Sequence, residues 1–95
     1  MNQLVLSATI AEAKPLRYTP AGLPAIDLKL DHESEVEEAG SRRQVKMELR
    51  AVAFGTMAET LAKQAVGSGF RFSGFLAAPR GGKHPVLHIQ SIQQD

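Results

Sequence analysis

The sequence lacks cysteine and tryptophan altogether, and it holds one tyrosine and four phenylalanines in 95 residues. Without cysteine there is no disulfide framework and no thiolate zinc site, so packing alone must hold the fold together. No apolar run approaches the ~20 residues that cross a bilayer, and the first residues lack the charged start of a secretory signal. We therefore expect a cytoplasmic protein without membrane contact.

The net charge is only +1, so the total charge does not indicate a nucleic-acid partner, and any such case depends on where the charges lie. Apolar residues make up 43% of the chain and charged residues 22%, which is typical of a globular protein. A chain of this length builds one modest core, and we expect a single domain over residues 1–95.

Metal binding and catalysis are both disfavoured by the residue patterns. His84 and His88 are four residues apart, but Pro85 and the alternation around it predict a strand, where four residues span ~13 Å. Two side chains so far apart cannot share one ion, and His32 stands alone. No serine lies in a nucleophile motif. We predict no metal, no cofactor and no enzymatic activity.

Alternation of apolar and polar residues predicts five strands. They cover residues 3–10, 25–32, 44–54, 70–77 and 85–93. Between the third and fourth, Met57, Leu61 and Ala65 recur at helical spacing, which predicts a short helix that plugs one end of the sheet. This order of elements predicts an all-β protein with the OB-fold, a five-stranded Greek-key barrel with a short helix between strands 3 and 4.

Four local features extend this prediction. Two prolines and a glycine predict a turn near Ala21 and Gly22. Residues 33–43 have no period, and their acidic start and basic end suggest a long, solvated loop. Gly74 marks a sharp bend or a close approach of two backbones, and the odd spacing of Ile89 and Ile92 suggests a β-bulge or the end of the strand.

The outward face of the third strand carries the first functional signal. Lys46, Arg50 and Phe54 are spaced by four, so they share one face and offer cations for phosphates and a ring for a base, as a single-strand binder requires. The alternative is an ordinary solvated face on which Phe54 seals the start of the helix. Both interpretations remain open at this point.

Two loops of an OB-fold flank the groove that its second and third strands cross. The first would bring Arg17 and Tyr18, and the last would bring Arg80 and Lys83 on a glycine-rich tip, Pro79–Lys83, which we call the basic finger. We expect this finger to close over a polyanion. The predicted DNA-binding residues are Arg17, Tyr18, Arg43, Lys46, Arg50, Phe54, Arg80 and Lys83.

Five stretches in combination resemble the bacterial primosomal replication protein N (PriB) family, and the resemblance covers nearly the whole chain. They read "QLVLSATI", "LRYTPAGLPAIDLKLDHES", "EEAGSRRQ", "GSGFRFSGFLA" and "VLHIQSIQ". The resemblance implies a homodimeric, non-enzymatic accessory factor of bacterial replication restart. Such a factor binds single-stranded DNA and the restart helicase PriA, and it helps to recruit later primosome proteins. It also implies that Arg17, Lys46, Arg80 and Lys83 fall where the family contacts DNA.

The chain departs from the family pattern in two places. Lys46 stands where the family has an aromatic residue, and the last loop is shorter and has fewer lysines. We therefore expect weaker stacking, with Phe54 as the candidate substitute for the ring, and a DNA affinity that is lower or shifted toward other contacts. Two alternatives stay open. One is a housekeeping single-stranded DNA-binding protein, although the chain stops at "QSIQQD", where such proteins continue into a recruiting tail. The other is a protein-interaction adaptor with the same barrel and no DNA binding. We expect a homodimer that pairs through the first strand, Leu4–Ile10.

Overall fold

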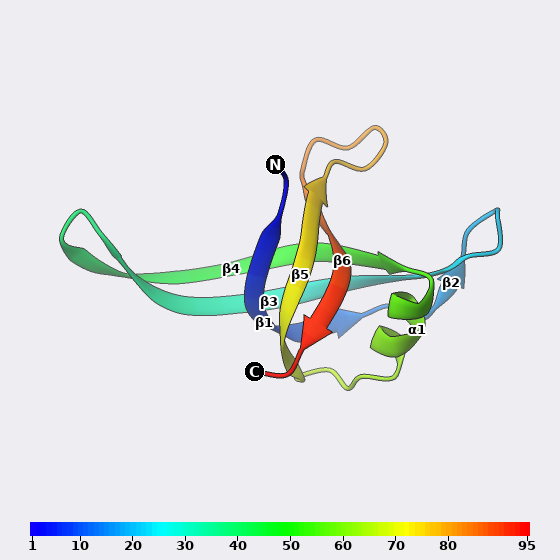
Figure 1. The fold of residues 1–95 in the computed structure, drawn as a ribbon, viewed down its shortest axis with the longest axis horizontal. Coiled ribbons are helices and arrows are strands. Elements are labelled where there is room, and N and C mark those ends of the chain that lie inside the picture. The colour runs from blue at the N-terminus through cyan, green and yellow to red at the C-terminus, as the bar shows by residue number, and fades with distance from the viewer.

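Six strands and one helix make up the computed structural model, which describes all residues 1–95 (Figure 1). In chain order they are β1 (Leu4–Ala13), β2 (Arg17–Tyr18), β3 (Pro24–Glu38), β4 (Ser41–Phe54), α1 (Thr56–Ala62), β5 (Gly69–Ala77) and β6 (Val86–Gln93). The sheet order β1-β5-β6-β4-β3 is closed by a further pairing of β1 with β3. β4 and β6 run parallel and the other pairs antiparallel. The predicted OB-fold is therefore confirmed, and β2 is a short addition to its edge.

The inward faces follow the predicted alternation. Leu28 and Leu30 of β3 and Phe70 and Phe72 of β5 are buried in one core cluster, together with Leu87 of β6. α1 covers one end of the barrel through Ala58 and Leu61, which are fully buried, and it contacts β3, β4 and β6. The helix ends at Ala62, earlier than predicted, and Ala65 is exposed outside it.

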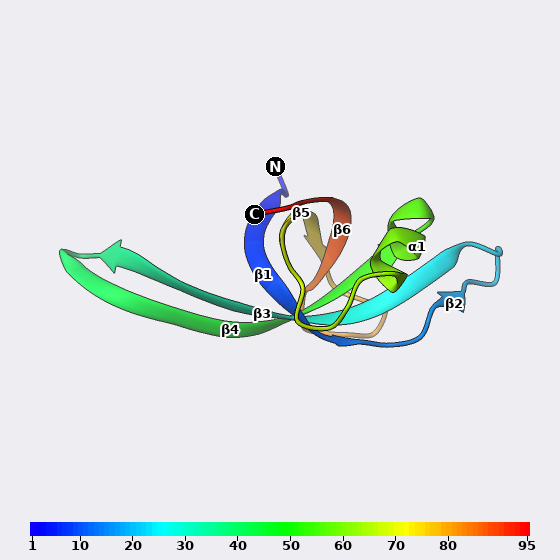
Figure 2. The ribbon, with the colours of Figure 1, turned by 90° about the horizontal axis from the view of Figure 1, so that it is seen from below.

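The prediction of a loop over residues 33–43 is wrong. β3 and β4 continue in register to Glu38 and Ser41 and form a long hairpin that projects from one side of the barrel (Figures 1 and 2). Ala39 and Gly40 both have positive φ, at 52° and 79°, as a two-residue type I′ turn requires. Because this ribbon extends past the barrel, it has little core to face, and its strands carry charged cross-strand pairs in place of an apolar period.

Two backbone predictions are confirmed in β5 and β6. A Cβ built on Gly74 would lie 1.8 Å from the carbonyl oxygen of His88, so only glycine allows the two strands to approach here. Ser73 pairs with Ser91 and Gly74 pairs with Ile89, which leaves Gln90 as the extra residue of a bulge. The helix of this fold is too short and too polar to be a membrane-spanning segment.

Candidate nucleic-acid interface

A groove of about 580 Å³ lies on the outer face of the barrel, where β1, β2, β3, β4 and β6 come together at the base of the basic finger. Strand register explains why its side chains share a face. Asp27 and Lys29 of β3 pair with Val52 and Arg50 of β4, and Phe54 follows two residues after Val52, so these side chains share the face that lines the groove. The charged lining residues are Glu12, Lys14, Arg17, Asp27, Lys29 and Arg50, and the others include Val52, Phe54, Pro79, Val86 and His88.

Three rings form a row along this side of the barrel. The parallel register sets Val52 beside His88, and Phe75 of β5 pairs with His88 from the other side. The rings of Phe75 and His88 are stacked, with centroids 4.7 Å apart and planes at 16°, and the rings of Phe54 and His88 lie 5.9 Å apart at 31°. We call Phe54, His88 and Phe75 the aromatic row. It joins side chains from three strands of the barrel.

Phe54 and His88 are the two members of the aromatic row that line the groove, and both are partly open to a ligand. Phe54 is 40% exposed, so part of its ring is open to a ligand. The imidazole of His88 forms no hydrogen bond within the chain, and no buried side-chain nitrogen lacks a partner. The nitrogens of His88 are therefore accessible from solvent, and the imidazole can donate or accept a hydrogen bond.

The cations of the groove fall into two groups. Arg17 and Lys29 face carboxylates: Arg17 is 2.7 Å from Asp27, and the Nζ of Lys29 is 3.7 Å from Glu12. Lys14 and Arg50 have no carboxylate partner within ion-pair distance, and both are exposed. Unpaired cations are the ones that a phosphate can approach without displacing another anion.

The pair of Arg17 and Asp27 has the best geometry of the ion pairs in the molecule. The Nε and Nη2 of Arg17 donate to the two carboxylate oxygens of Asp27 at 2.7 and 3.2 Å. These hydrogen bonds lower the pKa of Asp27, against the opposing effect of its partial burial, and the charge of Lys14 lowers it further. The same pair raises the pKa of Arg17. Both side chains are therefore charged at any pH near neutrality.

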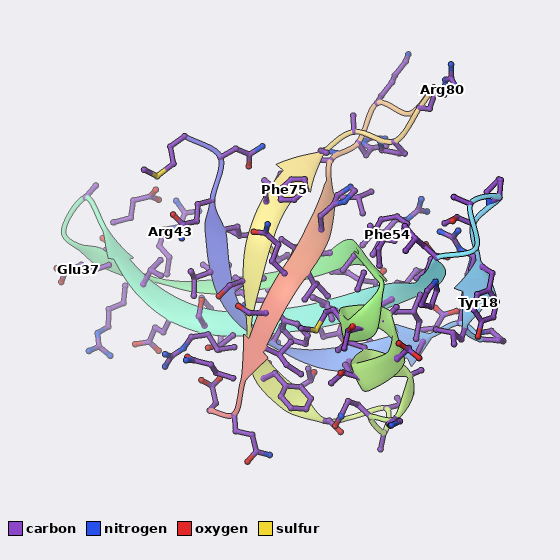
Figure 3. All side chains as sticks on the ribbon, turned by 45° about the vertical axis from the view of Figure 1, so that its right-hand side comes forward. Tyr18, Glu37, Arg43, Phe54, Phe75 and Arg80 are labelled. Carbon is purple, nitrogen blue, oxygen red and sulfur yellow. The ribbon has the colours of Figure 1, made fainter.

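The basic finger rises from the end of β5 beside the groove, and Pro79 at its base is one of the lining residues. Figure 3 shows Arg80 at its outer end, on the same side of the molecule as Phe54 and Tyr18. The amide of Gly82 donates to the carbonyl of Pro79 at 2.8 Å, and Gly81 has a φ of 76°, which together make a tight turn. Arg80 and Lys83 are exposed and form no ion pair.

The structure places Lys46 and Arg43 outside the groove. Both lie on the hairpin, and each faces a carboxylate of the opposite strand: Lys46 is 3.8 Å from Glu33, and Arg43 is 2.8 Å from Glu38. Figure 3 shows Arg43 at the end of the molecule that lies away from Arg80 and Tyr18. Tyr18 is 66% exposed on β2 beside Arg17 but does not line the groove.

Sequence reasoning missed three residues that belong to this site. The residue patterns raise His88 only as a metal ligand, and they indicate no role for Phe75 or Lys14. One signal was present: His88 and Phe75 sit between inward residues of their strands, so alternation directs both side chains outward. Their contact with each other and with Phe54 depends on which strands are neighbours, and that is not a local property.

Comparison with known proteins places the chain among single-strand binders. Residues 2–91 match a family model described as another single-strand binding protein family. The replication restart protein PriB of Bordetella pertussis is 46% identical over 95 residues, which cover 99% of this chain and 89% of that protein. PriB of Neisseria gonorrhoeae is 40% identical over 94 residues, which cover 98% and 93%.

Solved structures give the same result. The structure of PriB from Ralstonia solanacearum superimposes with a TM-score of 0.91 at 35% identity, covering 99% of this chain and 97% of that one. The single-stranded DNA binding protein of Thermus aquaticus gives a TM-score of 0.77 at 25% identity, and the match covers 98% of this chain and 49% of that one.

Proposed function

Because the chain belongs to the PriB family of single-strand binding proteins, we propose that it binds single-stranded DNA in the groove between the aromatic row and the basic finger. It acts in replication restart. In this role the exposed ring of Phe54 and the partly exposed ring of His88 stack on bases, and the unpaired cations Lys14, Arg50, Arg80 and Lys83 contact phosphates. Arg17 and Tyr18 border the same surface.

The observation that carries this proposal is the presence of open rings and unpaired cations on one face. Elsewhere the cations are mostly neutralised by carboxylates, including those of the hairpin. A protein whose basic residues serve only to keep it in solution has no need to gather its unpaired ones beside exposed aromatic rings. We therefore assign Lys46 and Arg43 a secondary part in DNA binding.

The finer parts of the role follow from family membership. We infer that the chain works by binding and not by catalysis, that it acts in the bacterial cytoplasm, and that it assists the restart helicase PriA and the recruitment of later primosome proteins. We infer that residues 1–95 form one domain, which carries out this role as a whole.

A homodimer is part of the proposal. β1 pairs with β5 from Leu4 to Thr9 but reaches β3 only from Thr9 onward, so one edge of the strand carries no partner strand between Leu4 and Ala8. A side-chain nitrogen of His32 donates to the carbonyl of Ser7 there, at 2.6 Å. Val5 is 54% exposed beside the open edge. A second β1 would protect this edge and double the length of the DNA-binding surface. Sedimentation that shows a monomer at micromolar concentration would contradict the dimer.

Fluorescence anisotropy with labelled oligonucleotides tests the main proposal. The protein is titrated into oligo(dT), the matching duplex and the same duplex with a single-stranded tail, at several salt concentrations. Each phosphate contact on a single strand contributes ~0.7 to the slope of log affinity against log salt, so four unpaired cations predict a slope of about −3. Saturable binding to the single strand and the tailed duplex, with much weaker binding to the blunt duplex, is the expected result.

Two outcomes would overturn the proposal. Absence of saturable binding to oligo(dT) at low salt would identify the chain as a protein-interaction adaptor. Binding with a slope near zero would mean that the groove and finger cations do not contact phosphates.

A further inference from the structure

Asp27 occupies the place in the groove where a phosphate would lie against Arg17. β2 is only two residues long, and its pairing of Arg17 with Ala25 sets the guanidinium beside Asp27, two residues further along β3. Arg17 uses two N–H groups toward the two carboxylate oxygens, at 2.7 and 3.2 Å. An arginine presents the same planar fork to a phosphate, so one anion excludes the other from this side of the guanidinium.

Asp27 is the one carboxylate that holds Arg17 in the free protein. The backbone amide of Lys14 donates to the carbonyl of Asp27 at 3.0 Å, which holds a second cation close to the carboxylate. No other carboxylate lies in an ion pair with Arg17, and Asp27 has Arg17 as its one ion-pair partner. The groove therefore contains a carboxylate that competes with DNA for Arg17, which is the arginine of this surface that forms a two-point ion pair.

The pair is also weak enough to be displaced. The side chains of Arg17 and Asp27 keep 49% and 37% of their surface exposed, so water and salt screen their attraction. A DNA strand that also contacts Lys14 and Arg50 brings several phosphates at once. The free energy lost with one screened ion pair is then small compared with the free energy gained from these contacts. A ligand with a single phosphate has no such compensation.

We propose that Asp27 is an affinity-determining residue that masks Arg17 in the free protein, weakens DNA binding, and favours strands with many phosphates over isolated nucleotides. This inference rests on the proposed function, since it assigns a role within the same groove. It makes Asp27 the opposite of a binding residue: its removal strengthens the interaction.

The test compares Asp27→Asn with Asp31→Asn in the wild-type background and again in an Arg17→Gln background. Asp31 lies on the same strand and face, pairs with Glu48 and forms no ion pair, so its substitution removes one negative charge and leaves Arg17 masked. We expect Asp27→Asn to tighten oligo(dT) binding roughly 3- to 10-fold and Asp31→Asn to change it less than about 2-fold, as exposed charges usually do.

The Arg17→Gln background separates masking from simple repulsion. If Asp27 acts through Arg17, the gain from Asp27→Asn must shrink to about 2-fold or less when Arg17 is absent, because only the repulsion of phosphate by a bare carboxylate remains. Equal gains in both backgrounds, or equal effects of Asp27→Asn and Asp31→Asn, would overturn the inference and leave the proposed function standing. Failure of both wild type and Asp27→Asn to bind oligo(dT) would overturn the proposed function, and the inference with it.

Discussion

Phe54 offers the sharpest test of how the groove binds a nucleic acid, because its ring can stack on a base but cannot pair with the charge of a phosphate. We predict that Phe54→Leu weakens binding to oligo(dT) about tenfold. Leucine keeps an apolar side chain at the same position on β4, so the substitution removes the aromatic face and leaves the strand and its charges unchanged.

The size of the effect follows from the exposure of the ring. A base that stacks on an aromatic side chain contributes ~1–3 kcal/mol. Phe54 is 40% exposed, so part of its surface is already covered by His88 and by the groove wall, and a base gains only the remainder. This favours the lower half of the range, about 1.5 kcal/mol, or roughly tenfold in Kd. Stability should change little, because Phe54 lies outside the buried core cluster.

An abasic strand with the same number of phosphates completes the assay. Stacking predicts that Phe54→Leu loses its tenfold effect on the abasic strand, and that His88→Leu behaves in the same way. Met47→Ala is the matched control, since Met47 is 43% exposed on the same strand but lies outside the groove. If Phe54→Leu weakens both strands equally, or neither, the stacking role of the aromatic row is refuted.

Four further predictions concern the finger, the barrel and the effect of acid. Arg80→Ala with Lys83→Ala should weaken binding to any single strand and make the salt slope about 1.4 less steep, because two phosphate contacts are lost; an unchanged slope would assign the finger to a protein partner. Gly81→Ala, at a φ of 76°, keeps every charge, and a loss of affinity measured for it would show that the shape of the turn matters as well. Gly74→Ala should cost about 3 kcal/mol and lower Tm by at least ~10 °C, because its Cβ would lie 1.8 Å from a carbonyl oxygen of β6; a near-native melting curve would contradict this geometry. Because the pKa of Asp27 is lowered, its ion pair stabilises the fold above pH ~4, and this contribution is lost as pH falls through the lowered pKa. Wild type should therefore have a Tm a few degrees above that of Asp27→Asn at neutral pH. This difference in Tm should disappear in acid.

Several features of this protein are local enough to be predicted from the sequence. A strand alternates its side chains with a period of two, so the inward faces of β1, β3 and β5 follow directly from the order of residues such as Leu28 and Phe72. Gly74 was predicted as a close approach because a glycine inside a strand pattern has few other reasons to be there. The shared outward face of Lys46, Arg50 and Phe54 was predicted for the same geometric reason, and the register confirms it.

The long hairpin shows where local pattern fails. Residues 33–43 have no apolar period, and period was the evidence for every other strand. Their strand conformation depends on pairing across the ribbon, where Glu35 meets Arg42 and Glu38 meets Arg43, and on the positive φ of Ala39 and Gly40. These contacts exist only once the two halves of the hairpin are aligned. The charged residues of this segment therefore indicated a loop when the sequence was considered alone.

The candidate site also has features that are local in the sequence and features that depend on the tertiary structure. Alternation by itself determined that Phe54, Phe75 and His88 point outward, and composition determined that the finger is basic. Only the closed barrel brings β4, β6 and β5 side by side, so that three rings from three strands form one row. Likewise only the tertiary structure decides which cations are neutralised, because an ion pair such as Arg17 with Asp27 depends on distance in space, and a sequence lists charges without stating which of them meet.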